Sequence, residues 1–470
     1  MTNLSGINLN NGSAVGAKRE GMESPSHSLA LMPKYEAYKD SQVQWIGDIP
    51  ANWHLEKAKW LFYKADRKPL VDDDIVTCFR DGQVTLRKNR RTEGFTNALK
   101  EHGYQRICKG DLVIHAMDAF AGAIGVSDSD GKSTPVYAAC VPRKKGKVNS
   151  YYYAYYMRNL ALSGFIVSLA KGIRERSTDF RFNDFAELFL PFPDYEEQTL
   201  IANFLDKKTA QIDDAIAIKE QQINLLKERK QIIIQQAVTL GLDPNVPMKD
   251  SGVDWIGKIP AHWEVKRIKH AGKIINGYAF PSDAFIQEGA RVMKISNIQT
   301  MRLDWSDSSY VDALWLNKTN QFRIYKGDLV FALTRPVIST GIKAALVDTD
   351  EPILLNQRNA VFRPNDTCDK NWIYFVLLTK DFINDFEMQI DITGQQPNIS
   401  TVAIGNLSFP LPPELEQKAI VSELSRRCNL LDMAVDDQIA QIEKLKEYKT
   451  TLINSAVTGK IKITPEMVEQ

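Results

Sequence analysis

The amino-acid sequence predicts a mixed α/β (α+β) fold with pseudo-twofold symmetry: two duplicated globular domains, separated by two long helical regions that form an antiparallel coiled coil. Three observations predict it. The chain repeats itself once, each copy combines short β-branched runs with helical segments, and each copy ends in a tract with a heptad pattern. The length of 470 residues also exceeds one ordinary domain, which holds about 150 residues.

Each copy begins with the same motif. Residues 39–53, KDSQVQWIGDIPANW, match residues 249–263, KDSGVDWIGKIPAHW, at 11 of 15 positions. Three further pairs follow in the same order: KGDLV at 109–113 and 326–330, LFLPFPDYEEQ at 188–198 and LSFPLPPELEQ at 407–417, and INLLKERKQIIIQQAVT at 223–239 and IEKLKEYKTTLINSAVT at 442–458. Only two copies exist, so the pattern indicates a duplication and not a short-period solenoid.

Composition and prolines set the domain boundaries. The first residues are rich in Gly, Ser and Asn, which is typical of disorder, and prolines precede both long helical tracts. Runs such as GDLVIHA and GDLVFAL predict strands, and residues 151–170 and 372–390 predict helices at matching places. The predicted order is a disordered N-terminal tail (1–34), globular domain 1 (35–194), helical region 1 (195–240), a linker with the start of the second copy (241–263), globular domain 2 (264–413), helical region 2 (414–460) and a C-terminal tail (461–470).

The composition is that of a globular protein, with 44% hydrophobic residues, 25% charged residues and a net charge of +1. No apolar run approaches the roughly 20 residues of a membrane span, and the N-terminus has no apolar signal-peptide core. The five cysteines are scattered without a CxxC pair. This distribution disfavours disulfides and structural zinc, and it favours a reducing cytoplasm.

A heptad pattern runs along both helical tracts. Positions spaced alternately four and three residues apart are apolar at the same six places in each copy and polar at the same two. Two copies of one seam predict that the helices pair with each other; the alternative is that each packs on its own globular domain. The predicted apolar seam consists of Ile212, Ile216, Ile223, Leu226, Ile233, Ala237, Leu431, Val435, Ile442, Leu445, Leu452 and Ala456.

The sequence carries none of the common catalytic motifs. It has no phosphate loop, no GxGxxG turn, no Asn/Asp-Pro-Pro-aromatic methyltransferase motif, no GxSxG elbow and no HExxH helix. One loose nuclease-like match joins Asp194 with Asp206, Lys207 and Lys208, and we interpret it as a charged helix face. We therefore predict no catalytic residue, no metal ligand and no cofactor in this chain.

Charge is unevenly distributed between the globular domains. Residues 54–193 hold 23 Lys and Arg against 16 Asp and Glu, whereas residues 264–413 hold 16 of each. Basic clusters at 87–91, 143–147 and 171–177 suit DNA phosphates and guanine edges, although each is also compatible with a solvated loop. The second domain offers amide-rich segments instead, such as NQRN (356–359) and TGQQPN (393–398), and amides suit adenine edges.

Taken together, these motifs resemble the DNA specificity (S) subunits of type I restriction-modification systems. The resemblance extends from about Tyr35 to Ile463, and GYAF (277–280), KISNI (294–298) and NQRNAVFRP (356–364) resemble target-recognition segments of that family. The sequence departs from the family at the first proline boundary, Pro191-Phe192-Pro193-Asp194, and in its leading tail of about 32 residues.

The resemblance implies a non-catalytic DNA-binding subunit that acts in DNA modification and in defence against foreign DNA. Each target-recognition domain would bind one half of a bipartite, asymmetric site in double-stranded DNA. The paired helices would set the distance between the domains and dock two methyltransferase (M) subunits, with two restriction or motor (R) subunits completing the complex. S-adenosylmethionine, ATP and Mg²⁺ are then expected in those partner subunits.

We expect the DNA contacts in loops and strand ends of the two globular domains. The expected residues are Arg87, Lys88, Arg90, Arg91, Lys171, Arg174 and Arg176 in the first, and Tyr278, Lys294, Asn297, Arg335, Gln357, Arg358, Gln395, Gln396 and Asn398 in the second. Two alternative functions remain open from the residues alone: a stand-alone DNA methyltransferase or nuclease, and a coiled-coil adaptor that binds only protein. Activity of the isolated chain on DNA would favour the first, and failure to bind DNA would favour the second.

Overall fold

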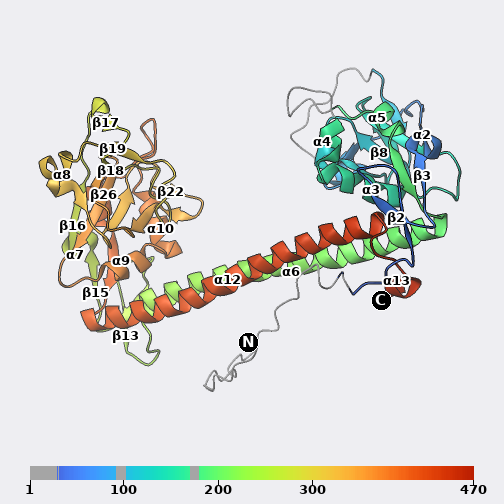
Figure 1. Ribbon diagram of the computed structural model, residues 1–470. Coiled ribbons are helices and arrows are strands. Elements are labelled where there is room, and N and C mark those ends of the chain that lie inside the picture. Colours follow the sequence, from blue (N-terminus) through green and yellow to red (C-terminus); the bar gives the residue numbers. More distant parts are fainter. Residues whose placement is uncertain (1–28, 30, 91–101, 170–178, 470) are drawn as a thin grey trace. The chain divides into compact units, whose positions relative to one another are not determined.

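The computed structural model describes residues 29, 31–90, 102–169 and 179–469 (Figure 1). The chain forms two compact units, unit 1 (Met1–Lys219 with Ala440–Gln470) and unit 2 (Glu220–Ile439). Both units mix helices and strands, as an α+β fold requires. Two long helices, α6 (Tyr195–Leu240) and α12 (Glu414–Val457), each contribute a segment to both units.

Unit 1 consists mostly of short strands with helices packed against them. Its strands are β1 (Tyr38–Asp40), β2 (Asp48–Pro50), β3 (His54–Lys57), β4 (Phe62–Lys64), β5 (Val76–Cys78), β6 (Val84–Leu86), β7 (Gln105–Ile107), β8 (Leu112–His115), β9 (Ile124–Val126), β10 (Gly131–Ser133), β11 (Tyr137–Pro142) and β12 (Phe189–Phe192). Its shorter helices are α2 (Ala58–Leu61), α3 (Ser150–Leu162), α4 (Phe165–Leu169), α5 (Phe182–Ala186) and α13 (Pro465–Glu469).

Unit 2 has the same kinds of elements and a larger second sheet. Its strands are β13 (Met248–Asp250), β14 (Lys258–Pro260), β15 (Glu264–Arg267), β16 (Gly272–Asn276), β17 (Phe285–Ile286), β18 (Ala290–Met293), β19 (Ser309–Val311), β20 (Arg323–Ile324), β21 (Leu329–Ala332), β22 (Val337–Ile338), β23 (Gly341–Ile342), β24 (Ala344–Leu346), β25 (Ile353–Leu355), β26 (Asn359–Pro364) and β27 (Ser408–Leu411). Its shorter helices are α7 (Ile268–Ala271), α8 (Trp315–Lys318), α9 (Lys370–Val376), α10 (Lys380–Met388) and α11 (Thr401–Asn406).

The central sheet has the same topology in both units. In unit 1 the strand order is β4-β11-β8-β9, and in unit 2 it is β16-β26-β21-β24; every neighbouring pair is antiparallel. The two-stranded sheets β3–β12 and β15–β27 also correspond, as do β1–β2 and β13–β14. Unit 2 alone adds a five-stranded sheet, β17-β19-β18-β25-β20, among the described residues.

The repeated WIGxIPAxW motif supplies one core tryptophan to each unit. Trp53 and Trp263 are fully buried, and their rings make edge-on contacts with Tyr152 and Trp372, at 6.4 and 5.7 Å between ring centroids. Each unit also has an equivalent hydrogen bond from an aromatic side chain to a proline carbonyl. Tyr153 donates a hydrogen bond to the carbonyl of Pro191, and Trp372 donates one to the carbonyl of Pro410. Buried tryptophans of this size contribute much of the hydrophobic stabilisation of a core.

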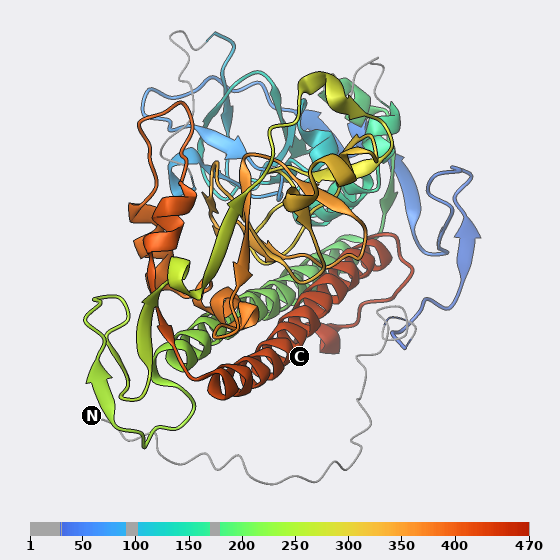
Figure 2. The same ribbon diagram turned by 90° about the vertical axis from the view of Figure 1, so that its left-hand side faces the viewer.

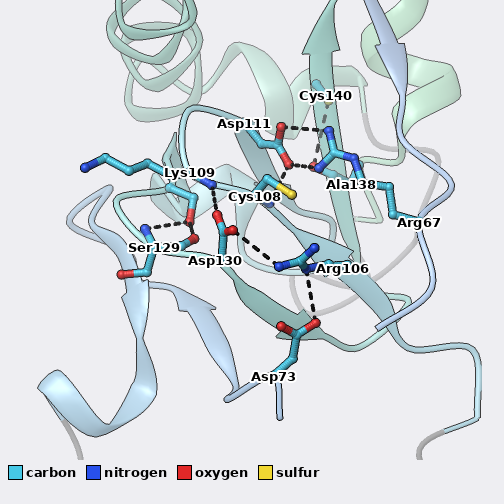
Figure 3. A network of polar contacts seen from close by, with 11 residues as sticks. Arg67, Asp73, Arg106, Cys108, Lys109, Asp111, Ser129, Asp130, Ala138 and Cys140 are labelled. Atoms are coloured by element: carbon cyan, nitrogen blue, oxygen red, sulfur yellow. Dashed lines mark hydrogen bonds and ion pairs between the residues drawn. The ribbon is translucent and has the colours of Figure 1, made fainter. Parts of the chain in front are cut away.

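The repeated KGDLV motif forms the turn before the central strand. Gly110 and Gly327 have φ values of 91° and 78°, a left-handed conformation that glycine adopts without steric cost. Asp111 then accepts a hydrogen bond from the amide of Cys108 at 2.8 Å. Figure 3 shows that the Asp111 carboxylate also pairs with both terminal nitrogens of Arg67. The polar groups at this end of the unit 1 sheet therefore bind one another.

Segments of α6 and α12 lie side by side within each unit (Figures 1 and 2). In unit 1, Lys449 pairs with Asp213 at 2.7 Å and Lys219 donates to Gln441, so the two segments run antiparallel. In unit 2, Lys230 pairs with Asp432 at 2.7 Å. All twelve apolar seam positions predicted from the heptads are buried or half-buried.

Two predicted helices are interrupted. The helix predicted over 151–170 is instead two helices, α3 and α4, separated at Gly164, whose φ is 85°. The helix predicted over 372–390 is instead α9 and α10, because the chain turns at Leu377–Thr379 and the Thr379 hydroxyl donates to the carbonyl of Val376. Helical periodicity continues across both breaks, which is why the sequence did not reveal them.

The two terminal segments extend the core of unit 1. Leu29, inside the predicted disordered tail, is 7% exposed and belongs to this core; the other described residues of the tail are 31–34. Ile461 and Ile463, in the predicted C-terminal tail, are buried in the same cluster. The amide of Lys462 donates to the carbonyl of Pro33 at 2.7 Å, so both segments are held in unit 1.

Candidate nucleic-acid interface

One end of the central sheet in unit 2 gathers most of the contact residues predicted in the second globular domain. Because neighbouring strands are antiparallel, the end of β16, the start of β26, the end of β21 and the start of β24 meet at the same end of the sheet. Residues 277–278, 356–358, 333–336 and 343 follow or precede those strands. We call these residues, with the loop 391–398, the loop edge of unit 2.

Backbone hydrogen bonds hold the loops of this edge together. The amide of Leu333 donates to the carbonyl of Arg358 at 2.8 Å, and the amide of Ile399 donates to the carbonyl of Leu333 at 2.9 Å. The amide of Arg335 donates to the carbonyl of Pro397 at 2.8 Å. Three loops that are distant in sequence are therefore fixed in one surface, and they are stable enough to present side chains in defined positions.

The loop edge exposes cations and amides. Gln357, Arg358, Gln395, Gln396 and Asn398 are all exposed, and Arg335 is exposed beside them. Among the residues that the structure describes, neither Arg335 nor Arg358 forms an ion pair. Arg is the usual reader of guanine and the amides suit adenine, so this surface has the donors that major-groove reading requires.

Tyr278 lies at the loop edge inside an aromatic cluster. Its ring lies 5.0 Å from Phe280, 5.7 Å from Trp315 and 5.4 Å from Phe322, measured between centroids. Its carbonyl accepts from the amide of Gln357 at 3.0 Å. The half-buried ring therefore supports the turn that carries Gln357 and Arg358.

Two residues of the KISN segment that were predicted to contact DNA interact with other residues of the protein. Asn297 is fully buried; its amide group donates to the carbonyls of Asp304 and Asp307, both at 2.8 Å, and its oxygen accepts from the amide of Lys294. The prediction that Asn297 contacts DNA is therefore wrong, because all of its hydrogen-bonding groups are used inside the protein. Lys294 remains half-buried and pairs with Asp307 at 2.7 Å.

Unit 1 has an equivalent loop edge. Here the amide of Ala116 donates to the carbonyl of Val136, and the amide of Phe180 donates to the carbonyl of Ala116, both at 3.0 Å. We define the loop edge of unit 1 as residues 116–118, 134–136 and 179–181. A cavity of about 560 Å³ opens there, lined by Lys64, Ala116, Met117, Pro135, Val136, Tyr137, Ala138, Asp179, Arg181 and Phe182.

The side chains at the loop edge of unit 1 differ from those of unit 2. His115 contacts the Tyr137 ring edge-on at 4.6 Å, and burial lowers the pKa of this histidine, which favours its neutral form. Burial also raises the pKa of Tyr137 to about 12. Arg181 pairs with Asp179 at 2.5 Å, and Arg80 pairs with Asp118 at 2.8 Å. Unit 1 therefore presents a cavity with mixed charges where unit 2 presents unpaired arginines.

The predicted basic residues of unit 1 are placed as follows. Lys88 pairs with Asp74 and Arg90 pairs with Asp81, both at 2.5 Å, and both pairs are exposed enough for DNA phosphates to compete with the carboxylates. Arg87 is half-buried, with its Nε 3.4 Å from the Thr77 hydroxyl. Arg91, Lys171, Arg174 and Arg176 lie outside the described residues.

Sequence reasoning missed several residues at these edges: Lys64, Met117 and Arg181 in unit 1 and Lys343 in unit 2. Alignment of the two sequence copies could have identified two of these residues. Aligning the two KGDLV motifs places Met117 opposite Thr334, and aligning the proline boundaries places Arg181 opposite Ser400. Arg181 and Ser400 are indeed the N-cap residues of α5 and α11.

Among the described residues, no group of three or more His, Cys, Asp or Glu side chains is arranged to bind a metal ion. All five cysteines are free. None of the helices in the described part of the chain is both long enough and apolar enough to cross a bilayer.

The fold consists of two compact units, and each unit has a loop edge at one end of its central sheet. The model of the type I restriction modification DNA specificity domain matches residues 260–444. The MjaVIII specificity subunit of a type I restriction enzyme from Methanocaldococcus jannaschii is 31% identical over 323 residues, which cover 68% of this chain and 72% of that protein. The EcoAI specificity subunit from Escherichia coli is 32% identical over 179 residues, or 37% of this chain and 30% of that protein.

Solved structures share the fold. A structure described in a study of complex assembly and conformational transition of the type I restriction-modification system has a TM-score of 0.67, with 14% identity, and covers 87% of this chain and 98% of its own. The HsdS subunit from Thermoanaerobacter tengcongensis has a TM-score of 0.54, with 16% identity, and covers 88% and 98%. The chain belongs to the family of type I restriction-modification specificity subunits. As a family member it is a non-catalytic subunit for DNA target recognition.

Proposed function

We propose that the chain binds a bipartite, asymmetric DNA target, one half-site with the loop edge of each unit. The observation that carries this proposal is the shared topology of the two central sheets, which presents loops at the same end in both units. The side chains on the two edges differ, so the two half-sites differ in sequence. Backbone phosphates supply affinity, and base edges supply specificity.

We further propose that α6 and α12 form one antiparallel coiled coil with pseudo-twofold symmetry. The support is the placement of two ion pairs, Lys230–Asp432 and Lys449–Asp213, whose members are exchanged by a shift of 219 residues. A pseudo-symmetric pair of helices offers two similar faces. It therefore docks two methyltransferase (M) subunits, and two restriction or motor (R) subunits join that assembly.

The chemistry of the assembly belongs to those partners. S-adenosylmethionine is bound by the M subunits, and ATP and Mg²⁺ are used by the motor subunits. The specificity subunit determines which adenine of the DNA is brought to the methyltransferase. We place the assembly in the cytoplasm, where free thiols such as the five of this chain remain reduced.

The test is co-expression with the M subunits of the same system, followed by genome-wide mapping of N6-methyladenine. We expect methylation at one split sequence, and none when this chain is omitted. The purified chain alone, given DNA, Mg²⁺ and S-adenosylmethionine, should neither methylate nor cleave. Methylation at scattered unrelated sequences, or activity of the chain alone, would contradict the proposal.

A further inference from the structure

Two cations lie at the base of the β22–β23 hairpin in unit 2, on the loop edge. The amide of Lys343 donates to the carbonyl of Pro336 at 2.7 Å, and the amide of Ala332 donates to the carbonyl of Lys343 at 2.9 Å. These two bonds close the segment 332–343 at its base. Arg335 and Lys343 are thus held next to each other on the two sides of one narrow hairpin.

Lys343 is buried without a counter-charge. Only 7% of the residue is exposed, and its ammonium donates to the carbonyl of Ile295. The pKa of Lys343 is lowered by burial and, to a smaller extent, by the charge of Arg335. Buried lysines are normally paired with a carboxylate, yet none lies within ion-pairing distance of Lys343 among the described residues.

Arg335 has an unusual backbone for its residue type. Its φ is 47°, in the left-handed region that favours glycine and costs other residues about 1 kcal/mol. The hydrogen bond from its amide to the carbonyl of Pro397 holds this conformation, and the residue is exposed. Non-glycine residues in such conformations cluster at functional sites.

Among the described residues, Lys343 therefore has a carbonyl but no anion as its partner, and the Arg335 guanidinium has neither. A guanine edge fits, because its O6 and N7 atoms are two adjacent acceptors that match the planar fork of an arginine. We infer that Arg335 reads a guanine in the half-site bound by unit 2, and that Lys343 is a positioning residue whose fixed charge keeps the Arg335 guanidinium directed outward. This inference rests on the proposed function and assigns one base contact within it.

The experiment uses the complex of this chain with its M subunits and the mapped target. Affinity is measured for every single-base change in both half-sites, with wild type, Arg335→Gly, Lys343→Met and Lys343→Arg. Glycine accepts a positive φ, so Arg335→Gly should keep or raise the melting temperature while it removes the side chain. We expect it to lose discrimination at one guanine position by about 10- to 100-fold and to leave the other positions unchanged.

Lys343→Met should weaken discrimination at that same position by a smaller factor, and Lys343→Arg should restore part of it. Replacing that guanine by 7-deazaguanine should weaken wild type but not Arg335→Gly. The matched control is Arg302→Gly, which removes another exposed arginine of unit 2 and should change no base preference.

Three outcomes would overturn the inference. A uniform loss over all sequences, with a flatter salt dependence, would make Arg335 a phosphate contact. A lower melting temperature with proportional loss everywhere would make the pair structural. An unchanged base profile in Arg335→Gly, with wild type still selective, would refute the inference alone, whereas a wild-type complex without any sequence preference would refute the proposed function.

Discussion

At the scale of single residues, the duplication preserves some roles and changes others. Gln198 and Gln417 are both fully buried. Each side chain donates hydrogen bonds to two backbone carbonyls and accepts one from a backbone amide. Their neighbours differ. Glu197 accepts from Trp53 and Tyr35. Glu416 instead lies 2.7 Å from His262, and the Trp263 indole N–H has no hydrogen-bond partner within the described part of the chain. The glutamines therefore form the repeated joint between each long helix and its globular core.

Replacing either glutamine by leucine should destabilise the unit that contains it. Gln198→Leu leaves the amide of Asn149 and the carbonyls of Lys147 and Pro193 without their bonds, which should cost about 3 kcal/mol of unfolding free energy. Urea denaturation measures the loss, and hydrogen exchange should place it in unit 1, or in unit 2 for Gln417→Leu. The control Gln221→Leu alters an exposed position of α6 and should change stability little. Equal effects of Gln198→Leu and Gln221→Leu would contradict this role.

Single-residue roles were the part that the sequence predicted least well. An asparagine near a strand end is a sound candidate for reading adenine, but the side-chain amide of Asn297 donates to the carbonyls of Asp304 and Asp307 instead. Those partners are fixed by a turn whose shape the sequence does not reveal. The buried position of Lys343 was equally invisible, because its acceptor, the carbonyl of Ile295, is 48 residues away.

At the scale of elements, the long helices were predicted well, because a heptad pattern depends only on periodicity. The predicted helical region 1 (195–240) corresponds to α6 (Tyr195–Leu240), and the predicted helical region 2 (414–460) corresponds to α12 (Glu414–Val457). The periodicity does not identify the polar partners between helices. Lys230 and Lys449 occupy polar positions of the seam. Their ammonium groups donate hydrogen bonds to Asp432 and Asp213, respectively.

Reversing one of these charges should destabilise the helix pair, and reversing both should restore it. Lys230→Asp places a second carboxylate beside Asp432 and should lower the unfolding free energy by about 1 kcal/mol, since Asp432 is half exposed and solvent screens the pair. The double variant Lys230→Asp with Asp432→Lys should recover most of that loss in thermal unfolding. Lys227→Asp, on an exposed position of the same helix, is the control. A double variant as unstable as the single one would argue against this contact.

At the scale of the whole molecule, the sequence predicted two duplicated domains from four repeated motifs, and each motif has a structural role: a core tryptophan, a glycine turn, a proline–glutamine joint and a helical seam. It did not predict how the modules share the chain. Unit 1 combines residues from both ends, while unit 2 is continuous. Only contacts between distant residues, such as Lys462 with Pro33, define that division.

Lengthening both long helices should change the spacing of the DNA target. One heptad added to α6 after position 225 and one to α12 after position 437 keeps both ion pairs and the seam, and it adds about 10 Å of helix. If the helices set the distance between half-sites, mapped methylation should show the same two half-sites with a gap longer by about three base pairs. Insertion into one helix alone should abolish site-specific methylation. An unchanged gap, or altered half-sites, would count against the helices as spacers.

The split composition of unit 1 also determines the order in which the modules are completed during synthesis. The core of unit 1 contains Leu452, Ala456, Ile461 and Ile463, which the ribosome adds after all of unit 2. Unit 2 ends at Ile439, so its core is complete before that of unit 1, although unit 1 begins first. Domains usually fold in the order of synthesis. Here the hydrophobic core of the first module stays incomplete until the second module has been translated.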